Sequence, residues 1–158
     1  MPVDLSFEGR SYPPSEPYVV GREAVRAFAT AVGASSPLHH DPMAARAAGY
    51  ADVVAPPTFA VVIAQRCEAQ YVADPAAGID FAQVVHAEER FASERPIVAG
   101  EEIVATLTVQ RVREVAGNVM VTTQVEMREG APAVGPDPDT APLVGHVTSM
   151  LVVRGEGK

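Results

Sequence analysis

The spacing of hydrophobic positions along the chain changes near residue 83. Before this point, apolar residues recur every three to four positions, which is typical of helices. Beyond it, apolar and polar residues alternate, which is typical of strands with one buried face. Helices followed by a run of antiparallel strands predict an α+β fold whose sheet wraps the most hydrophobic helix.

Three helices are predicted in the first half of the chain. Residues 22–32 carry apolar side chains at helical spacing and stop at Gly33. Residues 42–48 form a shorter helix, with Asp41 in position to cap its first turn. Residues 57–72 begin with more than one turn that has no polar face, so we expect this helix to be buried on several sides.

The strands and their connections follow from alternation and from turn-forming residues. The first twenty residues predict an extended arm that ends in a short strand at 18–20. Gly117-Asn118 predicts a tight hairpin turn, since both residues accept positive φ, and the proline-rich segment 130–142 predicts a long mobile loop. Three strands are expected to turn alternate residues toward one face: Ile103, Ala105, Leu107 and Val109; Val119, Val121, Thr123, Val125 and Met127; Val147, Ser149, Leu151 and Val153.

Size and charge limit the function classes. With 158 residues, 47% of them hydrophobic, the chain 1–158 is expected to be one domain with a sizeable core. The chain contains no run of about eighteen apolar residues, so no membrane span is predicted. Residues 1–6 lack the basic and apolar stretches of a secretion signal, which predicts a cytoplasmic protein. The net charge of −8 argues against nucleic acid as a partner.

The single cysteine, Cys67, has no second thiol for a disulfide or a metal clip, and it lies among apolar residues. It is interpreted as a small core side chain rather than a nucleophile. We expect no metal and no cofactor.

Candidate chemistry is concentrated between the first two predicted helices. The segment Gly33-Ala34-Ser35-Ser36-Pro37-Leu38-His39-His40-Asp41-Pro42 is followed by Val53-Val54-Ala55-Pro56-Pro57. It resembles the MaoC-like hot-dog hydratase motif, G-D-x-N-P-[IL]-H-x-D-P with a downstream His-Gly. Residues 91–102 also resemble that family's F-x-x-P-[IV]-x-x-G-[DE] strand entry. The resemblance covers about residues 15 to 154 and implies a hot-dog fold, an antiparallel sheet wrapped around a long buried helix.

The departures from the family motif fall on its chemical groups. Ala34 stands where the resemblance places a catalytic Asp, Ser36 where it places an Asn, and Pro56-Pro57 where it places the His-Gly pair. A methyl group cannot accept a proton, and the loss of acid–base assistance typically costs about 10²–10⁴ in rate. Proline has no N–H to offer an oxyanion, and one lost donor costs about 10²–10³.

His39 is the strongest catalytic candidate. In the family that it resembles, the motif His and Asp hold one water and move a proton and a hydroxyl on a thioester-linked acyl chain. An imidazole suits this work because its pKa lies near operating pH; the alternative is a histidine in a polar loop. Ser36 is a possible auxiliary group, and Asp41 a supporting one that caps the short helix or steadies the imidazole. His40 is expected to be exposed and to point elsewhere.

The start of the third predicted helix is the candidate substrate-binding segment, made of Pro56, Pro57, Thr58 and Phe59. The N–H groups of Thr58 and Phe59 are expected to be free and could replace the missing oxyanion donor. The alternative is that Pro56-Pro57 only begins the helix. His86, Glu88 and Arg90 are expected to form a charged row on one strand face, usually a solvated face, and His146 carries no signal of its own.

The chain keeps the family's motif positions but lacks the carboxylate of the water-binding pair. In this it resembles the non-catalytic, A-type subunit of the heterodimeric (3R)-hydroxyacyl-thioester dehydratases of fatty-acid synthesis. The resemblance implies a chain that shapes the acyl pocket beside a catalytic hot-dog partner and receives acyl-ACP or acyl-CoA. Two alternatives remain open. One is an autonomous (R)-specific enoyl-thioester hydratase that uses His39 as a homodimer, and the other is an acyl-thioester-binding protein without turnover.

Overall fold

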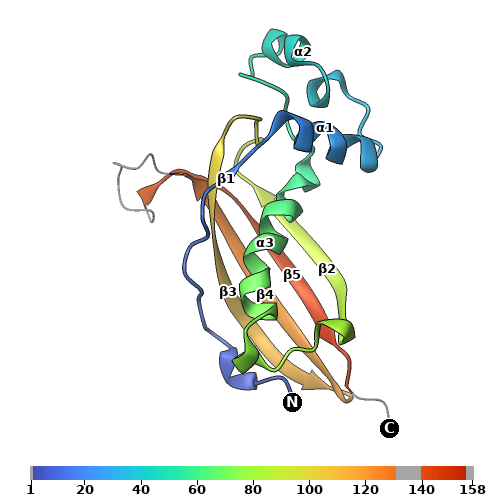
Figure 1. The fold of residues 1–158 in the computed structure, drawn as a ribbon, viewed down its shortest axis with the longest axis vertical. Helices are drawn as coiled ribbons and strands as arrows, with labels where there is room; N and C mark the ends of the chain where they lie inside the picture. The colour runs from blue at the N-terminus through green and yellow to red at the C-terminus, as the bar shows by residue number, and fades with distance from the viewer. Residues whose placement is uncertain (1, 131–139, 156–158) are drawn as a thin grey trace.

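One antiparallel sheet organises the molecule, with the strand order β1-β3-β4-β5-β2 (Figure 1). The computed structural model describes residues 2–130 and 140–155, so most of the predicted loop 130–142 lies outside the described residues. The strands are β1 (Tyr18–Val19), β2 (Val84–Ser93), β3 (Glu102–Val115), β4 (Asn118–Glu129) and β5 (Leu143–Val153).

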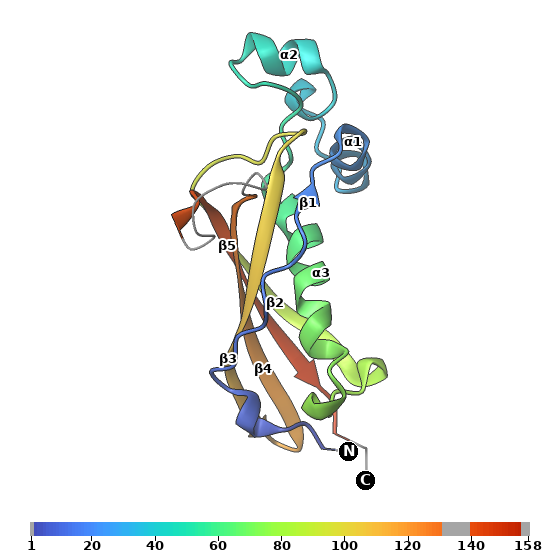
Figure 2. The same cartoon turned by 60° about the vertical axis from the view of Figure 1, so that its left-hand side comes forward.

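The helices are α1 (Arg22–Ala31), α2 (Pro42–Ala47) and α3 (Ala60–Val72), close to the predicted bounds. Helix α3 lies along one face of the sheet, while α1 and α2 lie beyond the sheet's upper end (Figures 1 and 2). A sheet curled around one long helix is the hot-dog arrangement that the sequence resemblance implied. Across the described residues, none of the helices reaches the length and hydropathy needed to cross a membrane.

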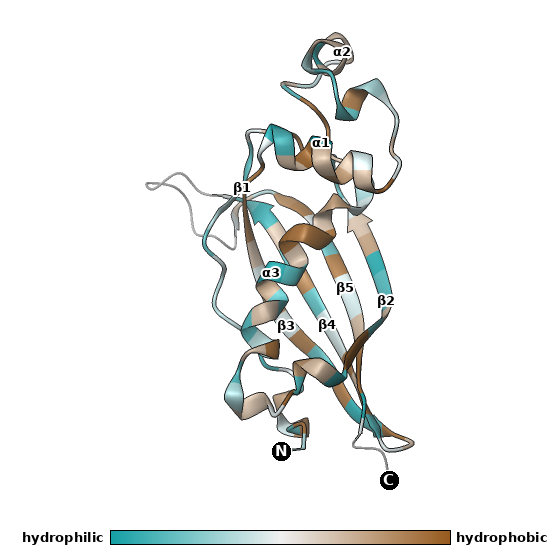
Figure 3. Ribbon diagram, turned by 45° about the vertical axis from the view of Figure 1, so that its right-hand side comes forward, coloured by the Kyte–Doolittle hydropathy of each residue, from teal (hydrophilic) through white to brown (hydrophobic). Residues whose placement is uncertain are grey.

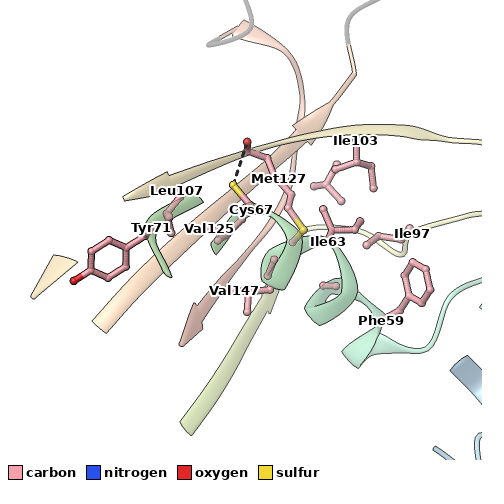
Figure 4. Packing of buried hydrophobic residues seen from close by; sticks show 14 of the residues in the cluster. Phe59, Ile63, Cys67, Tyr71, Ile97, Ile103, Leu107, Val125, Met127 and Val147 are labelled. Atoms are coloured by element: carbon pink, nitrogen blue, oxygen red, sulfur yellow. Dashed lines mark hydrogen bonds between the residues drawn. The ribbon is translucent and has the colours of Figure 1, made fainter. Parts of the chain in front are cut away.

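The core lies between α3 and the inner face of the sheet. Hydrophobic and hydrophilic stretches alternate along the strands (Figure 3), and the residues predicted to face inward are buried, except for Val119, which is partly buried and packs against the core. Cys67 lies among them, as expected, with its Sγ 3.5 Å from the carbonyl oxygen of Ala105 (Figure 4). Burial raises the pKa of this thiol to about 11, so Cys67 is a packing residue and not a nucleophile.

The hairpin between β3 and β4 corrects one prediction. The two residues with positive φ are Ala116 (51°) and Gly117 (79°), so the turn lies one position earlier than Gly117-Asn118. A turn with two positive φ values matches the right-handed twist of the flanking strands. Alanine is a poor residue for this conformation because its Cβ crowds the following carbonyl.

A β-bulge in β2 corrects a second prediction. The register with β5 shifts between His86 and Glu88, which leaves Ala87 as the extra residue. Because side chains alternate across a strand, the bulge separates His86 from Glu88 and Arg90. Glu88 and Arg90 still form an ion pair, but His86 turns to the inner face with Leu151, so the expected three-residue row does not exist.

Candidate active site

The two sequence motifs meet at one cavity of about 380 Å³ near the upper end of the sheet. His39, Pro56 and Pro57 line it, together with residues 91–97 from the second motif. Backbone bonds hold the two motifs together: the Ala55 N–H donates to the Ile97 carbonyl oxygen at 2.8 Å, and Val54 bridges Val98. The structure therefore brings the catalytic candidate and the proline pair into one site.

His39 is held by its backbone and by its ring. Its Nδ1 lies 2.6 Å from the carbonyl oxygen of Val54, and the Val54 N–H donates to the Leu38 carbonyl oxygen at 2.8 Å. A carbonyl oxygen can only accept, so Nδ1 carries the proton. In the neutral ring Nε2 therefore keeps its lone pair, which is the state a general base requires.

A charged cluster holds the helical segment that presents His39. The guanidinium of Arg22, at the start of α1, donates to both carboxylate oxygens of Asp52 at 2.9 and 2.6 Å, and Arg46 of α2 lies 3.5 Å from the same carboxylate. Arg26 donates to the carbonyl oxygen of His40 at 2.8 Å. These contacts join α1, α2 and the motif loop, so they set where His39 stands.

Ser36 and Asp41 serve as local caps. The Ser36 hydroxyl accepts from the Leu38 N–H at 3.4 Å at the start of the 3-10 turn Pro37–His39, and the Asp41 carboxylate accepts from the Met43 N–H at 2.8 Å at the start of α2. Capping is one of the two supporting roles that the sequence left open for Asp41, the other being to steady the imidazole. Neither side chain lines the cavity, so their part in the site is to shape the loop around His39.

The start of α3 offers fewer free N–H groups than expected. A 3-10 turn, Pro57–Phe59, precedes the helix, and the Phe59 N–H donates to the Pro56 carbonyl oxygen at 2.9 Å. Phe59 is therefore not a free donor, and its ring lies in the core. Thr58 is exposed, and its N–H, at the second position of the turn, is left without an intrahelical partner.

His40 corrects another expectation, because it is half-buried. Its Nε2 donates to the carbonyl oxygen of Ala34 at 2.8 Å, and its ring lies 6.4 Å from that of His39 at a steep angle. The two rings do point to different places, as expected. His40 thus fixes the backbone at Ala34, the position from which the family's carboxylate is missing.

Several side chains of the cavity wall were not candidates from the sequence, among them His146 and Arg95. His146 Nε2 lies 3.3 Å from a carboxylate oxygen of Glu126, and Arg95 pairs with Glu101 and Glu129 at 2.9 Å each. A lone histidine at the start of a strand has no motif spacing that could reveal it. Arg95 lies inside the second motif at a position that this motif leaves unspecified.

His39 can accept a proton in this cavity. The carboxylate that would hold a water with it in the MaoC-like motif is replaced by Ala34. Among the described residues, no carboxylate makes a hydrogen bond to His39. The site thus keeps an oriented imidazole, and the one carboxylate residue among the described residues that line the cavity, Glu94, makes no hydrogen bond to it.

Comparisons with known proteins agree with this fold. The family model for the FAS1-like dehydratase domain region matches residues 6–134. A UPF0336 protein of Clavibacter michiganensis is 50% identical over 156 residues, which cover 99% of each chain. A UPF0336 protein of Saccharopolyspora erythraea is 48% identical and covers 98% of this chain and 94% of its own.

Two solved structures are similar over nearly the whole chain. A MaoC-like dehydratase is 32% identical with a TM-score of 0.79; 95% of this chain matches 43% of that longer protein. A chain of the HadBC (3R-hydroxyacyl-ACP dehydratase) complex of Mycobacterium tuberculosis is 28% identical with a TM-score of 0.75, and the match covers 94% and 97%. The chain therefore belongs to the FAS1-like dehydratase-region family and shares the hot-dog fold of the MaoC-like dehydratases.

Proposed function

We propose that this chain is a subunit of a (3R)-hydroxyacyl-thioester dehydratase, in which it shapes the acyl pocket while a second hot-dog protein carries out the chemistry. The observation that carries the proposal is that His39 keeps the orientation of a general base, while the groups that would act with it are missing or already bonded. His39 is oriented with Nε2 available, yet a methyl group stands at the position of the carboxylate, and Phe59 N–H is already bonded. When residues act as one catalytic unit, losing a single member already costs about as much as losing the whole unit.

Two further observations support a role inside a complex. The similar HadBC structure is, by its name, a complex of a 3R-hydroxyacyl-ACP dehydratase. Strand β2 is a ten-residue edge of the sheet, and an exposed edge of this length favours pairing with a second protein. The substrate class would be an acyl chain linked as a thioester to acyl carrier protein or coenzyme A.

Hydration of crotonyl-CoA by the purified chain tests the proposal. We expect no turnover above background from the chain alone and measurable turnover once a catalytic hot-dog partner is added. Sedimentation of the chain at micromolar concentration is expected to show a dimer or larger species, and a stable monomer would remove the structural basis for a shared pocket.

A second candidate, an autonomous hydratase, is favoured by one observation. His146 and His39 line the same cavity, and His146 is paired with the carboxylate of Glu126. Turnover by the chain alone that disappears in His39→Ala and persists in His40→Ala would establish this alternative. Tight acyl-CoA binding without reaction, with or without a partner, would instead identify a binding protein.

A further inference from the structure

A second cavity of about 440 Å³ lies between α3 and strands β2 and β5, away from His39. Its lining is mostly apolar, but Glu68 and His86 also line it. One ligand atom from each of Glu68, His86 and Glu89 lies within 4.8 Å of the others. We call these three side chains the Glu-His-Glu cluster.

The strand register explains how this cluster forms. Thr123 of β4 pairs directly with Ser149 of β5, and Ser149 pairs directly with Glu89 of β2. Directly paired residues point to the same face, so a polar row crosses the otherwise apolar inner face. The β2 bulge at Ala87 adds His86 to this face, which an unbroken strand would not do.

Burial makes the polar row unusual. Glu68, Thr123 and Ser149 are the buried polar or charged residues of the described chain, and all three belong to the cluster or contact it. Helix α3 contributes Glu68, whose exposure is only 2%. Glu89 is partly buried beside it, and two carboxylates this close are costly unless a positive group compensates for them.

Each carboxylate is oriented through one of its oxygens. The Thr123 hydroxyl donates to Glu68 Oε1 at 2.6 Å, and the Ser149 hydroxyl donates to Glu89 Oε2 at 2.8 Å. Glu89 Oε1 is fully buried and accepts no hydrogen bond from any described residue. Hydroxyls that fix one oxygen and leave the other available are the usual outer support of metal-binding carboxylates.

We infer that the Glu-His-Glu cluster is a binding site for a divalent transition-metal cation of the zinc class. Two carboxylate oxygens and one imidazole nitrogen are a mixed oxygen and nitrogen ligand set that suits such ions. Ligands at about 2.0–2.2 Å from a tetrahedral Zn²⁺ stand about 3.5 Å apart, so the side chains need only small rotations. The adjoining cavity leaves a fourth position open.

The inferred site is independent of the proposed dehydratase role and departs from the expectation of no metal drawn from the sequence. His86 is exposed and lines the cavity, so an ion could reach the cluster from solvent on the side of His86.

Titration of the tag-free, chelator-treated chain with Zn²⁺, followed by calorimetry, tests the inference. We expect one Zn²⁺ per chain. Glu68→Gln, His86→Ala and Glu89→Gln should each weaken binding by more than the change in an outer hydroxyl, Thr123→Val, which should cost about 10–100-fold. Circular dichroism confirms that each variant is folded, and Co²⁺ absorption in the visible range reports the coordination geometry.

The matched control is Glu88→Gln, which removes the same charge one position along β2 on the opposite face. It should bind Zn²⁺ as the natural chain does. Absence of stoichiometric binding would overturn the inference. Binding that survives all three ligand substitutions, or that Glu88→Gln also weakens, would overturn it by showing that the cation sits elsewhere.

Discussion

Asp52 joins the start of α1 to the segment that leads from α2 to the His39 cavity. It accepts from Arg22 and from the Val53 N–H, and it lies near Arg46. The Arg22 guanidinium, and then the Val53 N–H, hold the pKa of Asp52 well below its usual value. A lowered pKa means that the carboxylate stabilises the fold above its ordinary pKa of about 4 and loses this effect as pH falls below it.

We therefore expect Asp52→Asn to lower the free energy of unfolding at pH 7, as measured by urea denaturation. The gap between the natural chain and the variant should narrow at pH 3, because the natural carboxylate is then partly protonated in the unfolded chain. Glu23→Gln is the control, since it removes only an exposed pair with Arg26. A gap that is equal at both pH values would contradict the stabilising role of the charge.

For single residues, the sequence predicted helix caps better than it predicted hydrogen-bond partners from distant parts of the chain. Asp41 caps α2 as expected, because capping depends on neighbours two or three positions away. The bonds from His39 to Val54 and from His40 to Ala34 depend on how the chain returns on itself. No local pattern contains that information, which is also why His146 carried no signal.

At the element scale, the hairpin between β3 and β4 contains a residue poorly suited to its conformation. Ala116 has a φ of 51° and precedes Gly117, where Asn-Gly is the preferred pair. Ala116→Asn should raise the free energy of unfolding by about 1 kcal/mol, because Asn tolerates the left-handed region. Urea denaturation measures this. Ala116→Val should have the opposite effect, and destabilisation by Asn would show that the turn is not strained.

The strands themselves were predictable and the bulge was not. Alternation in β3, β4 and β5 reports which face is buried, so residues such as Leu107 and Val125 follow directly from the pattern. The bulge at Ala87 depends on the register with β5, which a single strand does not encode. Its consequence, His86 beside Glu89, therefore became visible only in three dimensions.

At the scale of the whole molecule, one cavity lies at the start of α3 and another lies along its second half. The first lies near the motif loop and contains His39, and the second lies along α3 and contains Glu68 and His86. The hot-dog fold followed from two motifs in the right order around one apolar helix. The second cavity could not be predicted, because its walls are set by how α3 packs against β2 and β5, which local patterns do not encode.

The central claim is that this chain contributes the pocket and its partner contributes the chemistry. The most direct measurement is the kcat for crotonyl-CoA hydration by the reconstituted complex, with the motif histidine changed to alanine in one protein at a time. We expect His39→Ala to lower kcat by less than about tenfold, whereas the same change in the partner should lower it by more than about 10². A loss of more than about 10² from His39→Ala, with the partner variant still active, would contradict it.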